Sequence, residues 1–205
     1  MIRLILIPAA QTDWQAQGRL AGDTDLPLNE YGHRQAVVFG EEIAPLRPAV
    51  VHCGPEKATR QTGSVIAHGL LLKLRPGKEL RELDLGHWEG LTQEQFRERF
   101  ARVDRQWRNA PLSVESPEGE AVAHAADRLH RAVERIIKKH PDETAVVVLG
   151  RFAYALVRCE YLDHDYERFW EYIDGEPQWC VFEPPSQTAP GTDLTQPPGG
   201  GEASP

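Results

Sequence analysis

Short aliphatic runs recur along the chain and are separated by longer amphipathic segments. The runs at residues 2–7, 49–54 and 144–150 are continuous rather than alternating, which is typical of strands buried on both faces of a parallel sheet. Weaker runs at 70–76 and 178–183 predict a short third strand and a closing strand. Because these strands alternate with helices, we expect an α/β domain, a three-layer α/β/α sandwich with a mostly parallel sheet.

The segments between the runs carry helix signals. Asn29 can cap a helix, Thr92 and Gln95 form a capping-box pattern, and Pro55 fits a first helical turn. Between 119 and 139 apolar residues recur every three or four positions, which predicts one buried helix face. The predicted helices are 30–43, 55–69, 93–103, 119–139 and 151–159.

The carboxyl ends of the strands are where such a fold binds ligands. These ends fall at Pro8–Ala10, Cys53–Gly54 and Leu149–Arg151. The segment 81–91, which contains Gly and Asp residues, predicts an ordered loop. The first of these ends, Pro8-Ala9-Ala10, offers no side chain that can act as acid, base or nucleophile.

Charge and composition narrow the class of partner. A formal net charge of −8 argues against nucleic acid or an anionic membrane surface. No segment approaches the roughly 20 apolar residues of a membrane span. Three scattered cysteines fit neither a disulfide framework nor a zinc site and predict reduced thiols in the cytoplasm. The Pro- and Gly-rich residues 184–205 predict a disordered tail after a single domain at 1–183.

The segment VHCGPEKATR imitates the phosphate loop of a cysteine phosphatase. Six residues separate Cys53 from Arg60 where that chemistry needs five, and Pro55 removes an N–H from the loop, so a buried strand-end cysteine is favoured. The eight histidines form no i, i+4 pair on one predicted helix face, and no glycine-rich nucleotide fingerprint follows a strand. We therefore expect neither a metal nor a cofactor.

Five segments follow the order and spacing of a known family. TDWQAQGRLAGDTDLPLNEYGHRQA and ELRELDLGHWEGLT are specific, whereas GPEKATRQTG and TAVVVLGRFAYAL are recognisable mainly by position. The segments span 12–36, 54–63, 79–92, 117–129 and 144–156. Over roughly residues 2–183 the chain resembles the histidine phosphatase superfamily, and the resemblance implies the phosphoglycerate mutase-like fold.

The resemblance also implies what should stand at the end of the first strand. In that family an arginine, the histidine that attacks phosphorus and a glycine follow one another there. In this chain those positions are occupied by Pro8, Ala9 and Ala10, and an asparagine that commonly follows the tryptophan of the first block is Gln15.

Two further phosphate-binding positions are also altered. The resemblance places a second arginine at Ala58 and a second histidine at Gly150, while the family's proton-donating glutamate survives as Glu82. A phosphoryl group carries close to two negative charges, which a partly dehydrated pocket must balance with cations or donors. Without these cations, Glu82 would repel the substrate rather than protonate a leaving group.

The sequence therefore predicts a catalytically inactive family member, a pseudoenzyme with a binding or regulatory role toward an unidentified protein or small-molecule ligand. One alternative is a phosphomonoesterase or other hydrolase with a rewired site that uses Glu82, Arg151 or Cys53. Another is an interaction module that docks through its Pro-rich tail. The sequence leaves the oligomeric state open.

The vacated space raises two further expectations. Lys57 and Arg60 flank Ala58, but a two-residue shift on a helix turns a side chain by about 200°, so Arg60 should point elsewhere. Phe152, Tyr154 and Trp88 are candidates to fill the space, although ordinary core packing is the favoured interpretation for each.

Overall fold

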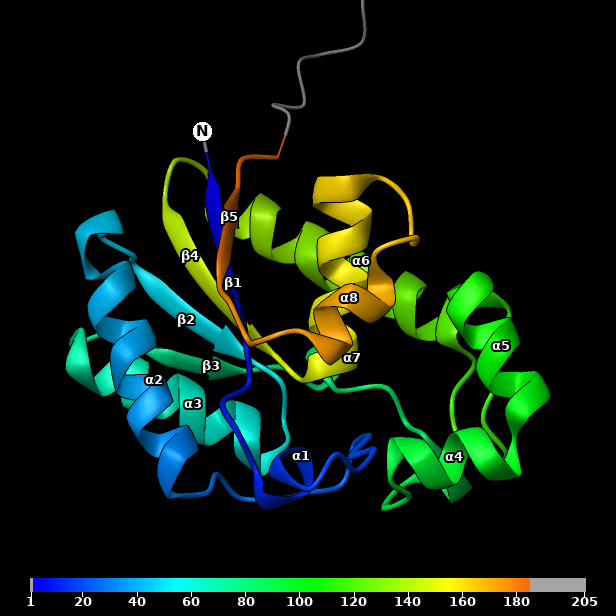
Figure 1. Cartoon of the computed structure of the whole chain (residues 1–205). Helices are drawn as coiled ribbons and strands as arrows, with labels where there is room; N and C mark the ends of the chain where they lie inside the picture. Colours follow the sequence, from blue (N-terminus) through cyan, green and yellow to red (C-terminus); the bar gives the residue numbers. More distant parts are fainter. Residues whose placement is uncertain (1, 185–205) are drawn as a thin grey trace, which may run out of the picture.

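A five-stranded sheet lies between two groups of helices in this computed structural model, which describes residues 2–184 (Figure 1). The strands are β1 (Arg3–Pro8), β2 (Val50–Cys53), β3 (Leu74–Pro76), β4 (Thr144–Leu149) and β5 (Cys180–Phe182). The helices are α1 (Asp13–Ala16), α2 (Glu30–Ile43), α3 (Lys57–Gly69), α4 (Gln93–Arg99), α5 (Ala101–Asn109), α6 (Val122–Lys139), α7 (Arg151–Arg158) and α8 (Phe169–Asp174). The predicted α/β sandwich is confirmed.

The sheet has the order β3-β2-β4-β1-β5, and its strands run parallel except for β5, which pairs antiparallel with β1. The register pairs Pro8 with Leu149 and Cys53 with Val148. Consequently the carboxyl ends of β1, β2 and β4 meet at one edge, where parallel α/β sheets bind ligands.

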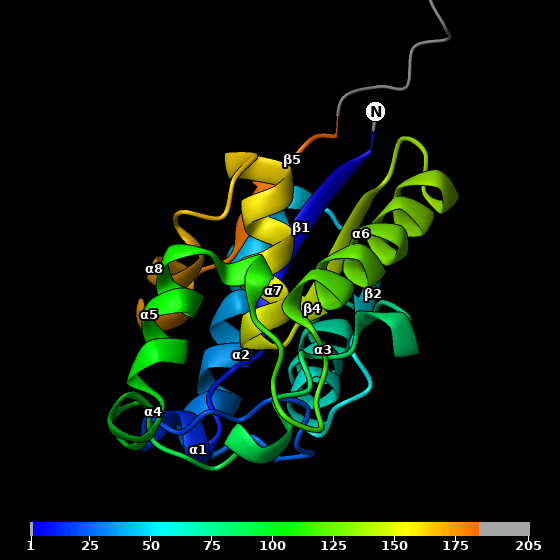
Figure 2. The same ribbon diagram turned by 90° about the vertical axis from the view of Figure 1, so that its right-hand side faces the viewer.

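The two faces of the sheet carry separate cores. On one face, residues of β1, β2 and β4 pack against Phe39 and Ile43 of α2 and Ile66 of α3. On the other, Leu4, Leu6 and their neighbours pack against α6 and α7, with α5 and α8 beyond. Figure 2 shows α6 and α7 in front of the sheet and α2 and α3 behind it. Burial on both faces explains why these strands read as unbroken aliphatic runs.

Several boundaries differ from the predictions. The helix expected from residue 55 begins at Lys57, because the Glu56 backbone is extended, so Pro55 precedes the helix instead of lying in its first turn. The helix expected at 93–103 divides into α4 and α5 where Phe100 leaves the helical region. The ring centroids of Phe100 and Phe96 lie 5.5 Å apart, and Phe100 also packs against Trp88.

Other elements were predicted incompletely. The run 70–76 forms only the three residues of β3, since Leu70 and Leu71 end the preceding helix, and Leu71 lies 92% exposed. The helix expected at 119–139 begins at Val122. Helices α1 and α8 were not predicted. The tail expected at 184–205 lies outside the described residues except for Pro184.

Candidate functional site

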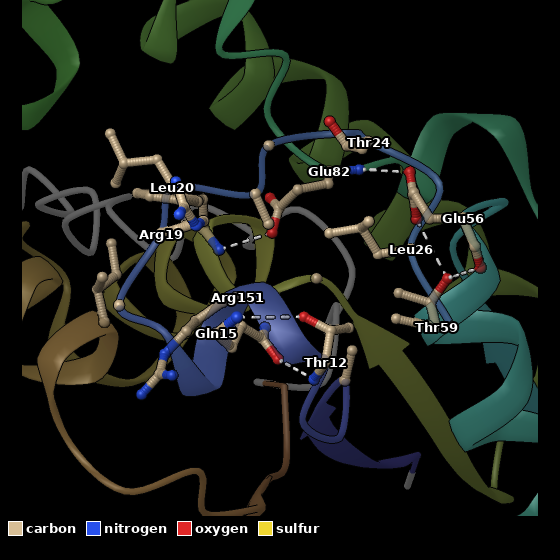
Figure 3. Close-up of a pocket in the computed structure, with 18 of the residues that line it drawn as sticks. Thr12, Gln15, Arg19, Leu20, Thr24, Leu26, Glu56, Thr59, Glu82 and Arg151 are labelled. Carbon is tan, nitrogen blue, oxygen red and sulfur yellow. Dashed lines mark hydrogen bonds between the residues drawn. The ribbon is translucent and has the colours of Figure 1, made fainter. Parts of the chain in front are cut away.

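Three positions that the sequence singled out as altered meet in one pocket with Glu82, the position that it singled out as kept. Ala9, Ala58, Glu82 and Gly150 line a cavity of about 80 Å³ at the carboxyl ends of the strands. We call it the strand-end pocket; Figure 3 shows its lining. The sheet register pairs Pro8 with Leu149, and this brings together the residues that follow them, Ala9 and Gly150.

The chain beyond β1 is held by backbone bonds. The Ala9 N–H donates to the Leu149 carbonyl (2.7 Å), and the Ala10 N–H donates to Thr62 Oγ1 (3.0 Å). Ala9 is 5% exposed, and Ala10 is fully buried in a small apolar cluster that includes the partly buried Ala58. This turn is therefore packed core with a methyl group where the resemblance implies an imidazole.

Gln15 has a local structural role. Its side-chain oxygen accepts from the Thr12 N–H (2.9 Å), while its own N–H donates to Thr12 Oγ1 (3.3 Å), which makes a capping box for α1. Gln15 lines the strand-end pocket, but its amide oxygen already serves this cap. The sequence signal of this cap is a Thr followed three residues later by a Gln.

Glu82 reaches across the pocket to a helix on another segment. Its carboxylate accepts from the Phe152 N–H (2.8 Å, Oε2) and the Ala153 N–H (2.7 Å, Oε1) at the start of α7, and from its neighbour Leu83 (2.7 Å, Oε1). Only 3% of Glu82 is exposed. The retained glutamate thus caps α7, where the helix dipole favours negative charge.

Gly150 makes this arrangement possible. A β carbon at residue 150 would overlap the Glu82 carboxylate oxygen Oε2. A histidine at this position, as the resemblance implies for the family, would therefore have to displace Glu82. The glycine at residue 150 and the inward position of Glu82 therefore depend on each other, which no local pattern could reveal.

A second buried carboxylate, Glu56, was missed by the sequence reasoning. Its Oε1 accepts from the Glu82 N–H (2.8 Å) and its Oε2 from Thr59 Oγ1 (3.1 Å), and only 8% of the residue is exposed. A glutamate just before a helix is usually a solvent-exposed capping residue, so no sequence signal indicates that the Glu56 side chain points inward.

The two buried carboxyl groups of the strand-end pocket both have raised pKa values. Burial raises the pKa of Glu82 to about 8; the Glu56 carboxylate adds to the rise, and the three N–H donors oppose it. Burial likewise raises the pKa of Glu56, against the hydrogen bonds it accepts. Both shifts arise because a charged carboxylate loses hydration in this cavity.

Of the two residues offered as rewired ligand contacts, Arg151 lines the strand-end pocket and Cys53 does not. The Arg151 guanidinium turns away from Glu82 (Figure 3) and donates to the Gly175 carbonyl. Cys53 is fully buried in the core between the sheet and α2–α3 and does not line the pocket, and burial raises the pKa of its thiol to about 12. Lys57 and Arg60 are both exposed and outside the pocket lining.

The aromatic candidates for filling the space are core residues. Phe152 lines the pocket, yet its ring stacks on Trp107 with centroids 5.6 Å apart. Trp88 packs against Phe96 at 5.0 Å, and the Tyr154 hydroxyl donates to the Gln178 carbonyl (2.6 Å). The group that occupies the space beside Gly150 is instead the Glu82 carboxylate.

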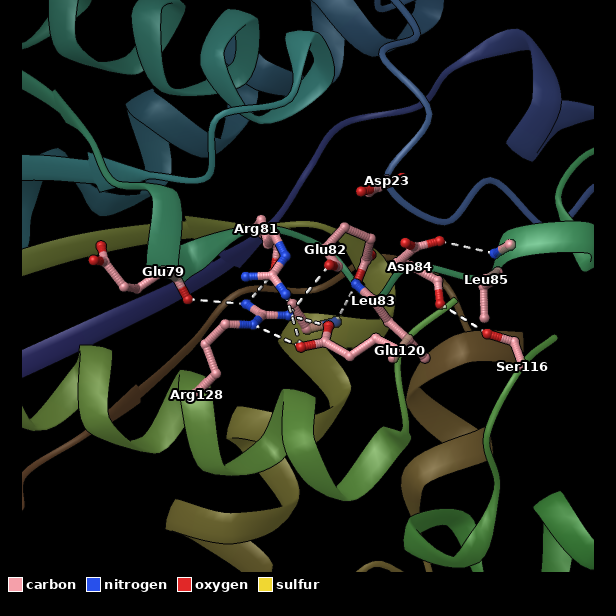
Figure 4. Close-up of polar contacts among 12 residues, drawn as sticks. Asp23, Glu79, Arg81, Glu82, Leu83, Asp84, Leu85, Ser116, Glu120 and Arg128 are labelled. Carbon is pink, nitrogen blue, oxygen red and sulfur yellow. Dashed lines mark hydrogen bonds and ion pairs between the residues drawn. The ribbon is translucent and has the colours of Figure 1, made fainter. Parts of the chain in front are cut away.

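An ion-pair network fixes the loop that carries Glu82 (Figure 4). The Arg128 guanidinium on α6 pairs with Glu120 (2.6 Å) and donates to the carbonyls of Glu79 (3.0 Å), Arg81 (2.9 Å) and Glu82 (3.3 Å). Arg128 is 9% exposed. One buried cation therefore positions the backbone on both sides of Glu82, a role that the helical pattern of α6 did not indicate.

Possible metal ligands gather in one place within residues 2–184. Asp23, Asp84 and Glu89 present oxygens within 4.8 Å of one another, all partly exposed. Glu89 already accepts hydrogen bonds from the Asp23 N–H and the Thr24 hydroxyl, and Asp84 accepts one from the Gly86 N–H. The sequence expectation of no metal stays a prediction.

Comparison with known proteins identifies the class. The profile of the histidine phosphatase superfamily (branch 1) matches residues 4–189. Phosphoserine phosphatase 1 of Hydrogenobacter thermophilus is 30% identical over 172 residues, which are 84% of this chain and 82% of that protein. This chain belongs to the histidine phosphatase superfamily.

Other similarities support the same fold. The metal-independent phosphoserine phosphatase of Arabidopsis thaliana is 30% identical over 148 residues, covering 71% of this chain and 62% of that protein. The solved structure of Bacillus stearothermophilus YhfR superposes with a TM-score of 0.75 at 24% identity, covering 83% of this chain and 84% of that one. Phosphoserine phosphatase from Entamoeba histolytica gives 0.77 at 20% identity, with 89% and 91% covered. In the part of the chain that the structure describes, no helix is both long and apolar enough to cross a membrane.

Proposed function

We propose that this chain is a member of the superfamily without phosphatase or mutase activity, which acts by binding a protein or small-molecule ligand. The observation that carries the proposal is Ala9 at the end of β1, where the resemblance implies the nucleophilic histidine. Among the described residues that line the strand-end pocket there is no imidazole, thiol or amine that could replace it.

The charge of the pocket supports the same conclusion. A phosphoryl dianion would have to enter beside the buried carboxyl groups of Glu82 and Glu56, with neither of the cations implied at positions 58 and 150. Arg19 and Arg151 also line the pocket, but their guanidinium groups already donate to the Gly90 and Gly175 carbonyls, so part of the opposite charge that such an anion needs is engaged elsewhere. Glu82 is also engaged by three N–H groups, so it is poorly placed to give a proton to a leaving group.

The hydrolase alternative finds less support. A nucleophilic Cys53 would need a low pKa and access to the pocket, whereas its thiol is buried with a raised pKa. The phosphatase names of the relatives describe those proteins. For this chain they argue for a shared fold and ancestry rather than a shared reaction.

The test is an activity assay on the purified full chain with p-nitrophenyl phosphate, phosphoserine and 3-phosphoglycerate. We expect no turnover above buffer, and none from Ala9→His alone, because the phosphate-binding cations would still be absent. Turnover that follows the protein through two different columns and falls in Glu82→Gln would overturn the proposal. A known phosphatase purified in the same way serves as the positive control.

A further inference from the structure

A second cavity also reaches Ala9 but has the opposite character. It measures about 210 Å³ and extends from Pro8 and Ala9 to α7, α8 and the segment 175–178. Three guanidinium groups line it, those of Arg151, Arg158 and Arg168. We call it the arginine cavity. Of these three, only Arg151 also lines the strand-end pocket.

Two of the three cations have no carboxylate partner within residues 2–184. Arg168 pairs with Glu171 (2.8 Å) and Asp163 (3.5 Å). By contrast, Arg158 donates to the Tyr154 hydroxyl (2.8 Å) and Arg151 to the Gly175 carbonyl, both neutral acceptors. Burial lowers the pKa of Arg151, with Asp174 and Glu176 opposing, so its charge is incompletely compensated.

Arg158 also has a donor that nothing in the described chain satisfies. Its Nε atom is buried and has no hydrogen-bond partner. Its guanidinium lies 4.1 Å from the centre of the Tyr172 ring, and Arg168 lies 5.1 Å from the same ring. Two guanidinium groups therefore lie against one aromatic ring, and one of them has no carboxylate partner among the described residues. This arrangement favours the binding of an anion.

We propose that the arginine cavity binds a small organic oxyanion, a carboxylate or phosphate group, with Arg151 and Arg158 as its cationic donors. Guanidinium groups present paired N–H donors that match the oxygens of both anions. Glu171 and Glu176 also line the cavity. Glu171 is paired with Arg168, whereas Glu176 is exposed and competes with the anion. Binding at this site requires no nucleophile and does not rest on the proposed loss of catalytic activity.

The experiment is titration calorimetry of the full chain with inorganic phosphate and, separately, succinate. We expect saturable binding of at least one probe at millimolar concentration or tighter, weakened at least tenfold by Arg158→Gln. Arg158→Lys, which keeps the charge, should recover part of the affinity. Glu176→Gln should tighten binding by removing a competing carboxylate. The stronger of the two probes identifies whether the site favours phosphate or carboxylate.

Arg19→Gln is the matched control, because Arg19 lines the strand-end pocket and not the arginine cavity. Its affinity should equal that of the unmodified chain. If Arg158→Gln does not fold, Arg151→Gln provides the test when it is compared with Arg19→Gln, because Arg151 lines both cavities and Arg19 lines only the strand-end pocket; the affinity should also fall with rising salt. No binding of either probe, or binding unaffected by these arginine variants, would overturn the proposal. Loss of binding in Arg19→Gln alone would place the anion in the strand-end pocket and count against both proposals.

Discussion

Gly150 and Glu82 are coupled through space: the absence of a side chain at residue 150 is what allows the Glu82 carboxylate to cap α7. The two residues are 68 positions apart in the sequence. Their contact joins two features that look independent in the sequence, a glycine after β4 and a glutamate in the loop 81–91.

Gly150→Ala should destabilise the protein, since the new β carbon would displace the Glu82 carboxylate and leave buried N–H groups of α7 without an acceptor. We expect a loss of about 1–3 kcal/mol in the free energy of unfolding, measured by urea denaturation. Gly69→Ala is the control, because a β carbon there meets open space at the end of α3; it should be neutral or stabilising by up to about 1 kcal/mol. Equal effects of the two substitutions would contradict the coupling.

Glu82 should make stability fall as the pH rises from about 4.5 to about 8. The unfolded chain releases this proton near pH 4.5, whereas in the folded protein the pKa is raised to about 8, so the folded state binds more protons in that window. Glu82→Gln cannot titrate and should remove that part of the slope, at most about 1.4 kcal/mol per pH unit.

The measurement is urea unfolding of both proteins at several pH values between 4.5 and 8. The exposed Glu98→Gln serves as control and should leave the slope unchanged. A stability difference between Glu82→Gln and the unmodified chain that stays constant with pH would show that Glu82 does not titrate in this range.

His52 should have the opposite pH dependence. Burial, together with His140 and the nearby cations Arg75 and Lys139, lowers the pKa of His52 from 6.5 to about 4. The unfolded state therefore binds more protons between these values, and stability should rise with pH through this window. His52→Gln should flatten that rise in thermal unfolding between pH 4 and 6.5, whereas the exposed His68→Gln should not. Parallel curves for all three proteins would disprove the assignment.

Arg128→Met should be strongly destabilising. It would leave Glu120, whose side chain is 12% exposed, without a principal cationic partner and would release three carbonyls of the loop around Glu82. Breaking such a buried pair typically costs about 3–5 kcal/mol.

Arg135→Met on the same helix is the control for Arg128→Met. Its 60% exposed side chain pairs only loosely with Glu79 (3.9 Å), so a change within about 0.5 kcal/mol is expected in chemical denaturation. A double variant with Glu120→Gln should cost less than the sum of the single changes. Additive costs would mean that Arg128 and Glu120 do not stabilise each other.

Local pattern predicted much of the scaffold. The aliphatic runs located β1, β2 and β4, and the Asn29 cap and the Thr92–Gln95 capping box marked the starts of α2 and α4. These signals were readable because they depend on residues within a few positions of one another. The division at Phe100 was not readable, since its ring packs against Trp88 as well as Phe96.

The sequence by itself determined the α/β class and the family resemblance, and it singled out Ala9, Ala58 and Gly150 as positions that differ from what the resemblance implies. Only the tertiary structure decided what surrounds those positions: Glu82 and Glu56 turned inward, Arg151 turned away, and a separate cavity lined by arginines. Strand and helix patterns follow from neighbouring residues. The position and charge state of a buried side chain depend on partners brought together by folding, often from distant segments.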